Sequence, residues 1–267
     1  MLMSCTIGFN SSREANTLGK YLADGLRYST LMASSGAHGM DDLSQKEWLT
    51  LLLEDEVDLH NLPERLRTDR DFVQRLLEVD GSFIQYLNNE FRMDEELTIL
   101  SLETGAEFHD VHPMYRGNRK AMLAAIKSAG FFPEQSPLTL ASDDLKGDPS
   151  VVLEAIKRDD RAFKAIAKSL QFDLDFLTRV LQHNASTFQF FPESIRDNAE
   201  IILTVLTDTR GIDPHILEWA SEKVRDDEQV ILAAIELDHT TYAYASKRMK
   251  MSSRILHLKQ TLLRHDN

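Results

Sequence analysis

One stretch decides the fold: Asp148-Pro149-Ser150-Val151-Val152-Leu153-Glu154-Ala155-Ile156, which has a second copy at Asp227-Glu228-Gln229-Val230-Ile231-Leu232-Ala233-Ala234-Ile235. In both copies an acidic residue comes first, and aliphatic residues follow in adjacent pairs one helical turn apart. This spacing is typical of an α-helix with one buried face. The aspartate belongs at the N-cap, where its side chain accepts hydrogen bonds from free backbone amides, and Pro149 suits the first helical position. The pattern predicts a capped amphipathic helix of roughly two to three turns.

The acidic start recurs along the chain at a nearly constant spacing. Asp69 and Asp94 are 25 residues apart, as are Asp148 and Asp173, and Asp197 follows 24 residues later. A fixed period is typical of small helical units that stack because none of them can bury its own apolar face. The sequence therefore predicts an all-α fold, a curved array or solenoid of helix-turn-helix repeats of about 25 residues.

The second half of each unit repeats as well. Leu217–Arg225 and Tyr242–Lys250 share an aromatic residue, an Ala-Ser pair, and an apolar residue followed by a basic one. Leu59–Arg67 and Phe188–Arg196 carry a proline in place of the serine, which indicates that a helix begins or breaks there. A basic last turn followed by the acidic first turn of the next unit suits both helix dipoles. We expect one short second helix in each unit.

The first 40 residues precede the array, which we assign to residues 41–267. The array opens with a capping box at Ser44–Glu47, in front of an apolar run. A second box at Ser11–Glu14 precedes leucines spaced four residues apart, which predicts a leading helix in residues 1–40. We expect this helix to cover the open apolar end of the array as an N-terminal cap; a functional appendage is the alternative.

One unit of the array is irregular, at residues 117–147. Asn118 takes the place of the opening aspartate, and Phe131–Pro137 interrupts the helical pattern. This departure indicates either a longer loop within a decayed repeat or a kink between two parts of the array.

The composition is that of an ordinary folded chain. Apolar residues make up 42% of the sequence and charged residues 27%, so a disordered chain is excluded. No stretch approaches the ~20 apolar residues of a membrane span, and the first residues lack the features of a secretory signal. The single cysteine, Cys5, excludes an intrachain disulfide and fits a reducing compartment. These features predict a cytoplasmic protein.

The charge is unevenly distributed. The net charge is −13, yet residues 241–267 hold six Lys or Arg residues against one Asp, which leaves about −18 for the rest. Such a body repels phosphate backbones, so we expect no nucleic-acid partner. The basic end is interpreted as a solvated polar cap on the last repeat, with a nucleic-acid or lipid surface as the weaker alternative.

Motifs for catalysis and metal binding are scarce. No phosphate-binding glycine loop, Gly-x-Ser-x-Gly or His-Glu-x-x-His is present, and one cysteine excludes the usual structural zinc sites. The densest polar cluster is Glu107–His112, in which two histidines three residues apart flank an aspartate and could hold a metal or an acid/base pair. We expect no cofactor and no metal. The alternative is an enzyme whose catalytic residues are Glu107, His109, Asp110 and His112.

Aromatic residues recur at equivalent positions of the short second helix. They form either one core position repeated along the array or a stacking platform for a ligand. Aromatic residues dominate core energetics, which favours the core position. The aromatic residues in question are Tyr86, Phe190, Trp219 and Tyr244, of which we predict burial for the last three, together with the aliphatic Val152, Ile156, Ile202, Val230 and Ile235.

The two halves together form a recognisable pattern: an acidic pair, Val-(Ile/Val)-Leu-x-Ala-Ile, a turn, then (Leu/Tyr)-x-(Tyr/Trp)-Ala-Ser-x-x-(Val/Met)-(Arg/Lys). It resembles a tandem α-helical repeat family of unknown function, with two helix-turn-helix units in a repeat of about 50 residues. The match is strongest at residues 148–173 and 197–250 and weaker at 44–94. The family has no assigned catalytic residues. Its members are common in intracellular bacteria, and many resemble translocated effector proteins or their regulators, which implies the same context here.

The expected function follows from the stacked units and the acidic body. We predict a non-enzymatic protein–protein interaction module, either a bacterial effector translocated into a host cell or a regulator (inhibitor) of another effector. Its partner should be a protein with a basic or mixed-charge surface, bound along an extended acidic face of the array. The candidate residues of this face are Glu54, Glu56, Glu103, Glu107, Glu154 and Asp159.

Overall fold

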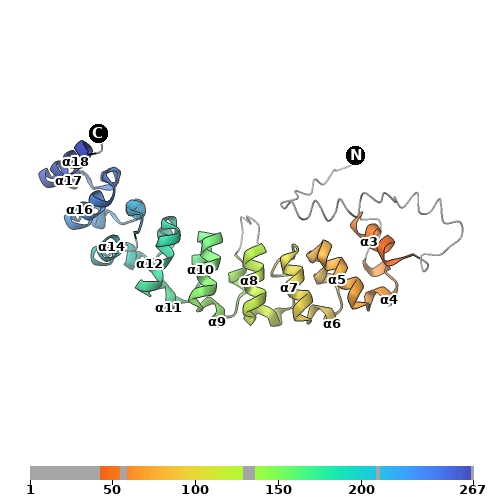
Figure 1. The fold of residues 1–267 in the computed structure, drawn as a ribbon. Coiled ribbons are helices and arrows are strands. Elements are labelled where there is room, and N and C mark those ends of the chain that lie inside the picture. Colours follow the sequence, from red (N-terminus) through yellow and green to blue (C-terminus); the bar gives the residue numbers. More distant parts are fainter. Residues whose placement is uncertain (1–42, 55–58, 129–135, 209–210, 266–267) are drawn as a thin grey trace, which may run out of the picture. The chain divides into compact units, whose positions relative to one another are not determined.

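The computed structural model describes residues 43–54, 59–128, 136–208 and 211–265, and all regular structure in these ranges is helical (Figure 1). The predicted N-terminal cap at residues 1–40 lies outside the described residues. The chain divides into two compact units, residues 1–132 and 133–267, and each is described by itself.

In the first unit, long α-helices alternate with short helical segments. Helix α7 packs against α5 on one side and α8 on the other, and the 3-10 helix η3 packs on both α5 and α7. The long helices are α3 (Gln45–Leu53), α5 (Arg70–Val79), α7 (Glu95–Glu103) and α8 (Arg119–Ser128). The short ones are the 3-10 helices η2 (Leu59–Asn61), η3 (Gly81–Tyr86) and η4 (Pro113–Gly117), and the α-helices α4 (Glu64–Arg67) and α6 (Asn89–Arg92).

The second unit repeats the order found from α3 to α6, a long α-helix, a 3-10 helix and a four-residue α-helix, whereas η4 of the first unit is followed directly by α8. The long helices are α10 (Pro149–Arg158), α12 (Leu174–His183), α14 (Ala199–Leu206), α16 (Glu228–Leu237) and α18 (Ser253–His265). The 3-10 helices are η5 (Pro137–Leu140), η6 (Asp160–Ala165), η7 (Ala185–Phe190), η8 (Pro214–Glu218) and η9 (His239–Tyr244). The four-residue helices are α9 (Asp143–Lys146), α11 (Lys168–Gln171), α13 (Glu193–Arg196), α15 (Glu222–Arg225) and α17 (Lys247–Lys250).

The predicted short second helix is in fact two elements. Where one helix was expected over Tyr242–Lys250, η9 ends at Tyr244 and α17 begins at Lys247. Ala245 and Ser246 between them have extended backbone, and the Ser246 hydroxyl caps α17 by accepting from the Met249 amide. A 3-10 helix has poor hydrogen-bond geometry and stays short, so the chain needs a new N-cap before the next α-helix can begin.

The predicted caps of the long helices are confirmed except at α14, where Asn198 is the N-cap and Asp197 is the C-cap of α13. One side-chain oxygen of Asp148 accepts from the amides of Ser150 and Val151, at 2.9 and 3.3 Å. Asp69, Asp94, Asp173 and Asp227 occupy the same position in their helices, and Ser44 and Glu47 form the predicted capping box. In the irregular unit, Asn118 caps α8 through its carboxamide oxygen, 3.0 Å from the Ala121 amide. Asn therefore replaces Asp without loss of the helix start.

The aliphatic half of the core prediction is confirmed and the aromatic half is wrong. Val152, Ile156, Ile202, Val230 and Ile235 are all 0% exposed. Phe190, Trp219 and Tyr244 are only half-buried, and Tyr86 is 59% exposed. The core position lies two residues earlier, at Phe188 and Leu217. A 3-10 helix has three residues per turn, so residues two apart lie about 120° from one another and cannot share the buried face.

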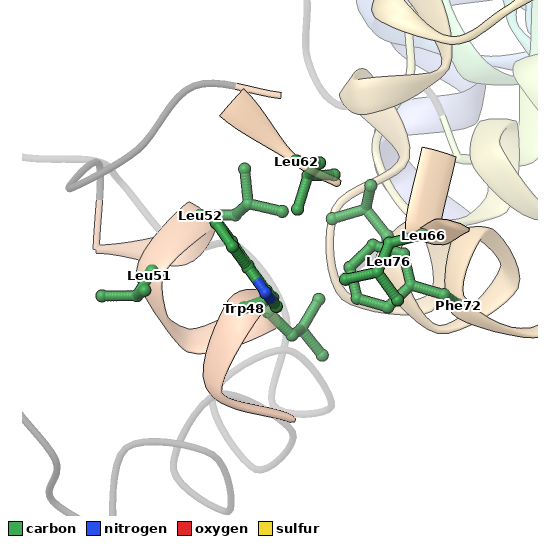
Figure 2. Packing of buried hydrophobic residues seen from close by; sticks show 8 residues of the cluster. Trp48, Leu51, Leu52, Leu62, Leu66, Phe72 and Leu76 are labelled. Atoms are coloured by element: carbon green, nitrogen blue, oxygen red, sulfur yellow. The ribbon is translucent and has the colours of Figure 1, made fainter. Parts of the chain in front are cut away.

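The first helices of the first unit share a core of large side chains (Figure 2). The core draws on α3, on the residue after η2, on α4 and on α5. Its fully or almost fully buried members include Trp48, Leu51, Leu52, Leu62, Leu66, Phe72 and Leu76.

Candidate functional site

The Glu107–His112 cluster is built around one exposed histidine. Nδ1 of His109 lies 3.0 Å from the Glu107 carboxylate, and Nε2 lies 3.2 Å from the Asp110 carboxylate. Asp110 is only 7% exposed, and its other oxygen accepts from the Glu107 amide at 2.9 Å. The Asp110 carboxylate thus closes the turn that precedes η4, while His109 lies on the surface with a side chain that is 64% exposed.

The second histidine of the cluster has a different role. His112 is the N-cap of η4, and its Nδ1 accepts from the Met114 amide at 3.3 Å. The structure therefore pairs His109 with two carboxylates but commits His112 to the backbone. Within the described residues, no group of three or more His, Cys, Asp or Glu side chains has an arrangement suited to a metal ion.

The six acidic residues predicted to form one face are divided between the two units. Glu54, Glu103 and Glu107 belong to the first unit, at or just beyond helix ends, and Glu56 lies outside the described residues. The two in the second unit have cationic partners: Glu154 pairs with Lys157 and Asp159 with Arg161, both at 2.8 Å. Asp159 also caps η6. These local partners offset part of the negative charge on which the prediction rests.

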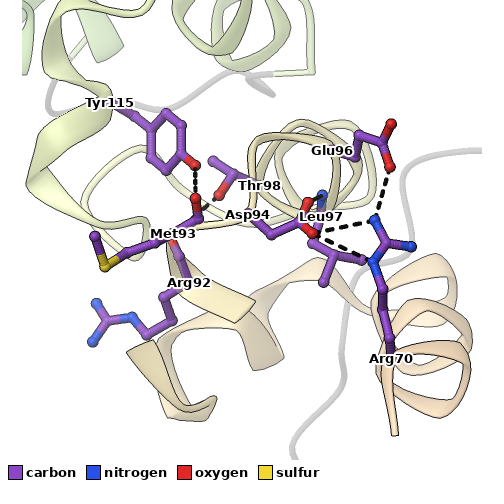
Figure 3. A network of polar contacts seen from close by, with 8 residues as sticks. All are labelled: Arg70, Arg92, Met93, Asp94, Glu96, Leu97, Thr98 and Tyr115. Atoms are coloured by element: carbon purple, nitrogen blue, oxygen red, sulfur yellow. Dashed lines mark hydrogen bonds and ion pairs between the residues drawn. The ribbon is translucent and has the colours of Figure 1, made fainter. Parts of the chain in front are cut away.

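Other charged side chains join helices that are neighbours in space but about 25 residues apart in sequence, a role that the sequence interpretation missed. Arg70 on α5 reaches Asp94 and Glu96 at the start of α7, at 3.2 and 2.7 Å (Figure 3). These two hydrogen bonds raise the pKa of the Arg70 guanidinium, that to Glu96 being the stronger. The Tyr115 hydroxyl donates to the Met93 carbonyl at 2.6 Å, and burial raises the pKa of this phenol. Each contact joins residues about one period apart.

The same links occur in the second unit and explain the acidic pair. Asp227 caps α16, whereas Asp226 accepts from the Ser246 hydroxyl and pairs with Arg248 at 2.8 Å, one layer further on. The hydrogen bonds from Arg248 and then Ser246 lower the pKa of the Asp226 carboxyl. Asp197 makes the equivalent hydrogen bond to Ser221 one layer earlier, at 2.6 Å. The first acid of the pair therefore joins layers and the second caps the helix.

The half-buried aromatic residues of the second unit lie on successive 3-10 helices. Helices η7, η8 and η9 pack side by side in that order. Phe190 ends η7, Trp219 follows η8, and Tyr244 ends η9. We name these three residues the aromatic ledge. The ring of Phe190 already has the Lys164 ammonium 4.8 Å from its centroid.

Acidic residues lie near Tyr244, the C-terminal member of the ledge. His215 packs edge-on against Tyr244, with ring centroids 5.7 Å apart, and its Nδ1 lies 2.8 Å from the Asp213 carboxylate. The pKa of the Tyr244 phenol is raised, first by burial and then by the charges of Glu218, Asp213 and Asp238. The ledge thus combines open aromatic surface with three nearby carboxylates.

Comparison with known proteins gives one result. Residues 49–101 match the family model of a domain of unknown function (DUF4116). The match starts in α3 and ends in α7, so it overlaps the 44–94 stretch of the resemblance described above and spans two of its periods. The stronger stretches at 148–173 and 197–250 lie outside the matched residues. No curated protein and no solved structure matches the chain.

The described part of the chain has no helix long and apolar enough to cross a lipid bilayer.

Proposed function

We propose that this chain is a solenoid of stacked helical units of about 25 residues that acts as a non-enzymatic protein-binding scaffold. Three backbone hydrogen bonds at equivalent positions support the stacking. The amides of Ala167, Ser221 and Ser246 donate to carbonyls one layer earlier, at 2.9, 3.2 and 2.9 Å. A link that recurs with the sequence period is what a regular stack requires. By the resemblance to effector-associated repeats, the scaffold acts as a bacterial effector or as a regulator of one.

The observation that carries the binding proposal is the aromatic ledge. Phe190, Trp219 and Tyr244 keep part of their surface open, whereas Phe188 and Leu217, two residues before the first two of them, are buried. Large aromatic residues are the side chains that most often supply the energy of protein interfaces. Three of them in or directly after neighbouring 3-10 helices of one unit offer partly exposed aromatic surface, whereas the six acidic residues are divided between the two units.

The chemistry of the ledge favours a cationic partner segment. Aromatic ring faces attract Arg and Lys side chains, and Lys164 already occupies this position over Phe190. Asp213, Glu218 and Asp238 add negative charge beside Tyr244. The partner therefore presents an extended segment rich in Arg or Lys. The basic partner surface is the one predicted from the net charge, but the acidic residues proposed to bind it are Asp213, Glu218 and Asp238 and not the six predicted from the sequence.

Fluorescence of Trp219 tests this proposal directly. The only other tryptophan, Trp48, is 0% exposed and lies in the first unit. An Arg-rich peptide should give a saturable change in emission that is lost in Trp219→Phe, whereas a Glu-rich peptide of equal length should give none. Asp213→Asn with Glu218→Gln should weaken binding about tenfold and reduce its salt dependence. Glu200→Gln, in the first turn of α14, is the control and should bind as the wild type.

Two outcomes would overturn the proposal. One is equal binding of the acidic and basic peptides, since the charges near Tyr244 would then have no role. The other is unchanged affinity in Trp219→Ala and Tyr244→Ala variants that retain the wild-type circular dichroism.

A further inference from the structure

A cavity of about 100 Å³ opens between the first layers of the array, far in sequence from the aromatic ledge. Its walls are apolar and almost fully buried: Leu62, Phe72 and Leu76 are at most 3% exposed. Arg67, Tyr86 and Asn88 also line it, and all three are exposed residues at its mouth. Every residue that lines the cavity lies within the segment 49–101 that matches the domain of unknown function.

The polar side chains at the mouth of the cavity make no side-chain hydrogen bonds to other described residues. Arg92 and Arg196, which end α6 and α13 as Arg67 ends α4, donate to the carbonyls of Asp110 and Trp219 in the next layer, at 3.3 and 3.2 Å. The Arg67 guanidinium has no such partner among the described residues.

Asn88 and Tyr86 are similarly free. Asn88 is the N-cap of α6, yet its side chain makes no capping hydrogen bond. Tyr86 is 59% exposed, and its hydroxyl has no hydrogen bond within the described ranges. A charged donor, a carboxamide and a phenol therefore surround the entrance to an apolar cavity.

We propose that this cavity binds the free carboxyl terminus of a peptide that ends in a branched aliphatic residue. A cavity on the order of 150 Å³ holds benzene, so 100 Å³ suits one Val, Leu or Ile side chain and not a long acyl chain. The Arg67 guanidinium matches a carboxylate, with which arginine forms paired hydrogen bonds. The Asn88 carboxamide both donates and accepts, as the terminal peptide group requires. Tyr86 offers a ring face to the preceding residue.

Isothermal titration of the full chain with Gly-Gly-Gly-Leu tests the proposal. The peptide with a free carboxyl terminus should bind, and the same peptide with an amidated terminus should bind at least about tenfold more weakly because the charge-assisted hydrogen bonds are lost. Arg67→Gln should produce a loss of similar size. Arg116→Gln, in η4 and not among the residues that line the cavity, removes an equal charge and should bind as the wild type.

A second variant tests the apolar part of the cavity without removing a side chain from the hydrophobic core. Leu87→Phe adds volume at a half-buried lining residue and should abolish binding while the thermal midpoint stays near that of the wild type. Equal affinity for the acid and the amide would overturn carboxylate recognition. Tight binding of 4-methylpentanoate, at the affinity of the peptide, would overturn the peptide assignment. Absence of binding at millimolar peptide would overturn both.

Discussion

Two equivalent pairs of residue positions, one in each unit, differ in how their side chains are packed. In the second unit, Phe191 stacks on Phe163 with ring centroids 4.8 Å apart, and Phe188 lies 5.2 Å from Phe191, so the three rings form an aromatic cluster. In the first unit the same two positions hold Leu59 and Leu62, and the cavity lies beside them. The positions that hold phenylalanine in this aromatic cluster hold leucine where the cavity lies.

The difference extends to the arginine that follows. Beside the aromatic cluster, Arg196 donates to the Phe191 and Trp219 carbonyls, at 3.1 and 3.2 Å. Beside the cavity, Arg67 is exposed. We expect side-chain volume at these positions to contribute to whether the short helical segments pack closely or leave a cavity. Three predictions test this comparison, from the largest expected effect to the smallest.

The largest effect on stability is expected from removing a ring of the aromatic cluster. Phe188 is 1% exposed and touches the Phe191 ring, so Phe188→Ala should lower the free energy of unfolding by about 3–5 kcal/mol. Leu59 is half-buried beside a space that is already open, so Leu59→Ala should cost less than half as much. Urea denaturation followed by circular dichroism measures both. Equal costs would show that the two contacts are equally well packed.

Exchanging phenylalanine and leucine between the two equivalent positions, 191 and 62, should change the free energy of unfolding by a smaller amount, and the two substitutions should differ in size. Phe191→Leu should lower the free energy of unfolding by about 1–2 kcal/mol, because it creates the missing volume in the second unit. Leu62→Phe should change it by less than about 1 kcal/mol, since the cavity can receive the added ring atoms. A loss of about 1–3 kcal/mol in Leu62→Phe, the usual cost of overpacking, would contradict a cavity at this position.

The smallest effect concerns the polar links between layers. The folded-state pKa of Asp226 lies below its unfolded value, so its contribution to stability is present above the unfolded pKa, near about 4, and is lost as the pH falls through the folded pKa. Asp226→Asn should therefore narrow the difference between the urea midpoints at pH 6 and pH 3. Asp143→Asn, in the first turn of α9, is the control and should leave that difference close to wild type. Identical narrowing in both variants would contradict a specific role for the Arg248 and Ser246 contacts.

Local signals in the sequence were enough to predict the helices and their starts. Asp148 and Asn118 cap helices because a side-chain oxygen next to free amides acts within three residues. The aliphatic pairs of α10 and α16 are buried because their spacing places them on one face of an α-helix. The candidate site was less accessible to such reasoning. His109 and its two carboxylate partners are close in sequence, but how far each of these side chains is exposed could not be predicted from the sequence.

The sequence alone determined the helical class, the period, the caps and the aliphatic core of this protein, since all of these depend on residues a few positions apart. The tertiary structure decided which residue of each 3-10 helix is buried, which acid of a pair joins two layers, and where a cavity remains. Each of these depends on a neighbour about 25 residues away. Trp219 is half-open and Leu217 buried because of the layer packed against them, and the spacing of aromatic residues carries no information about that layer.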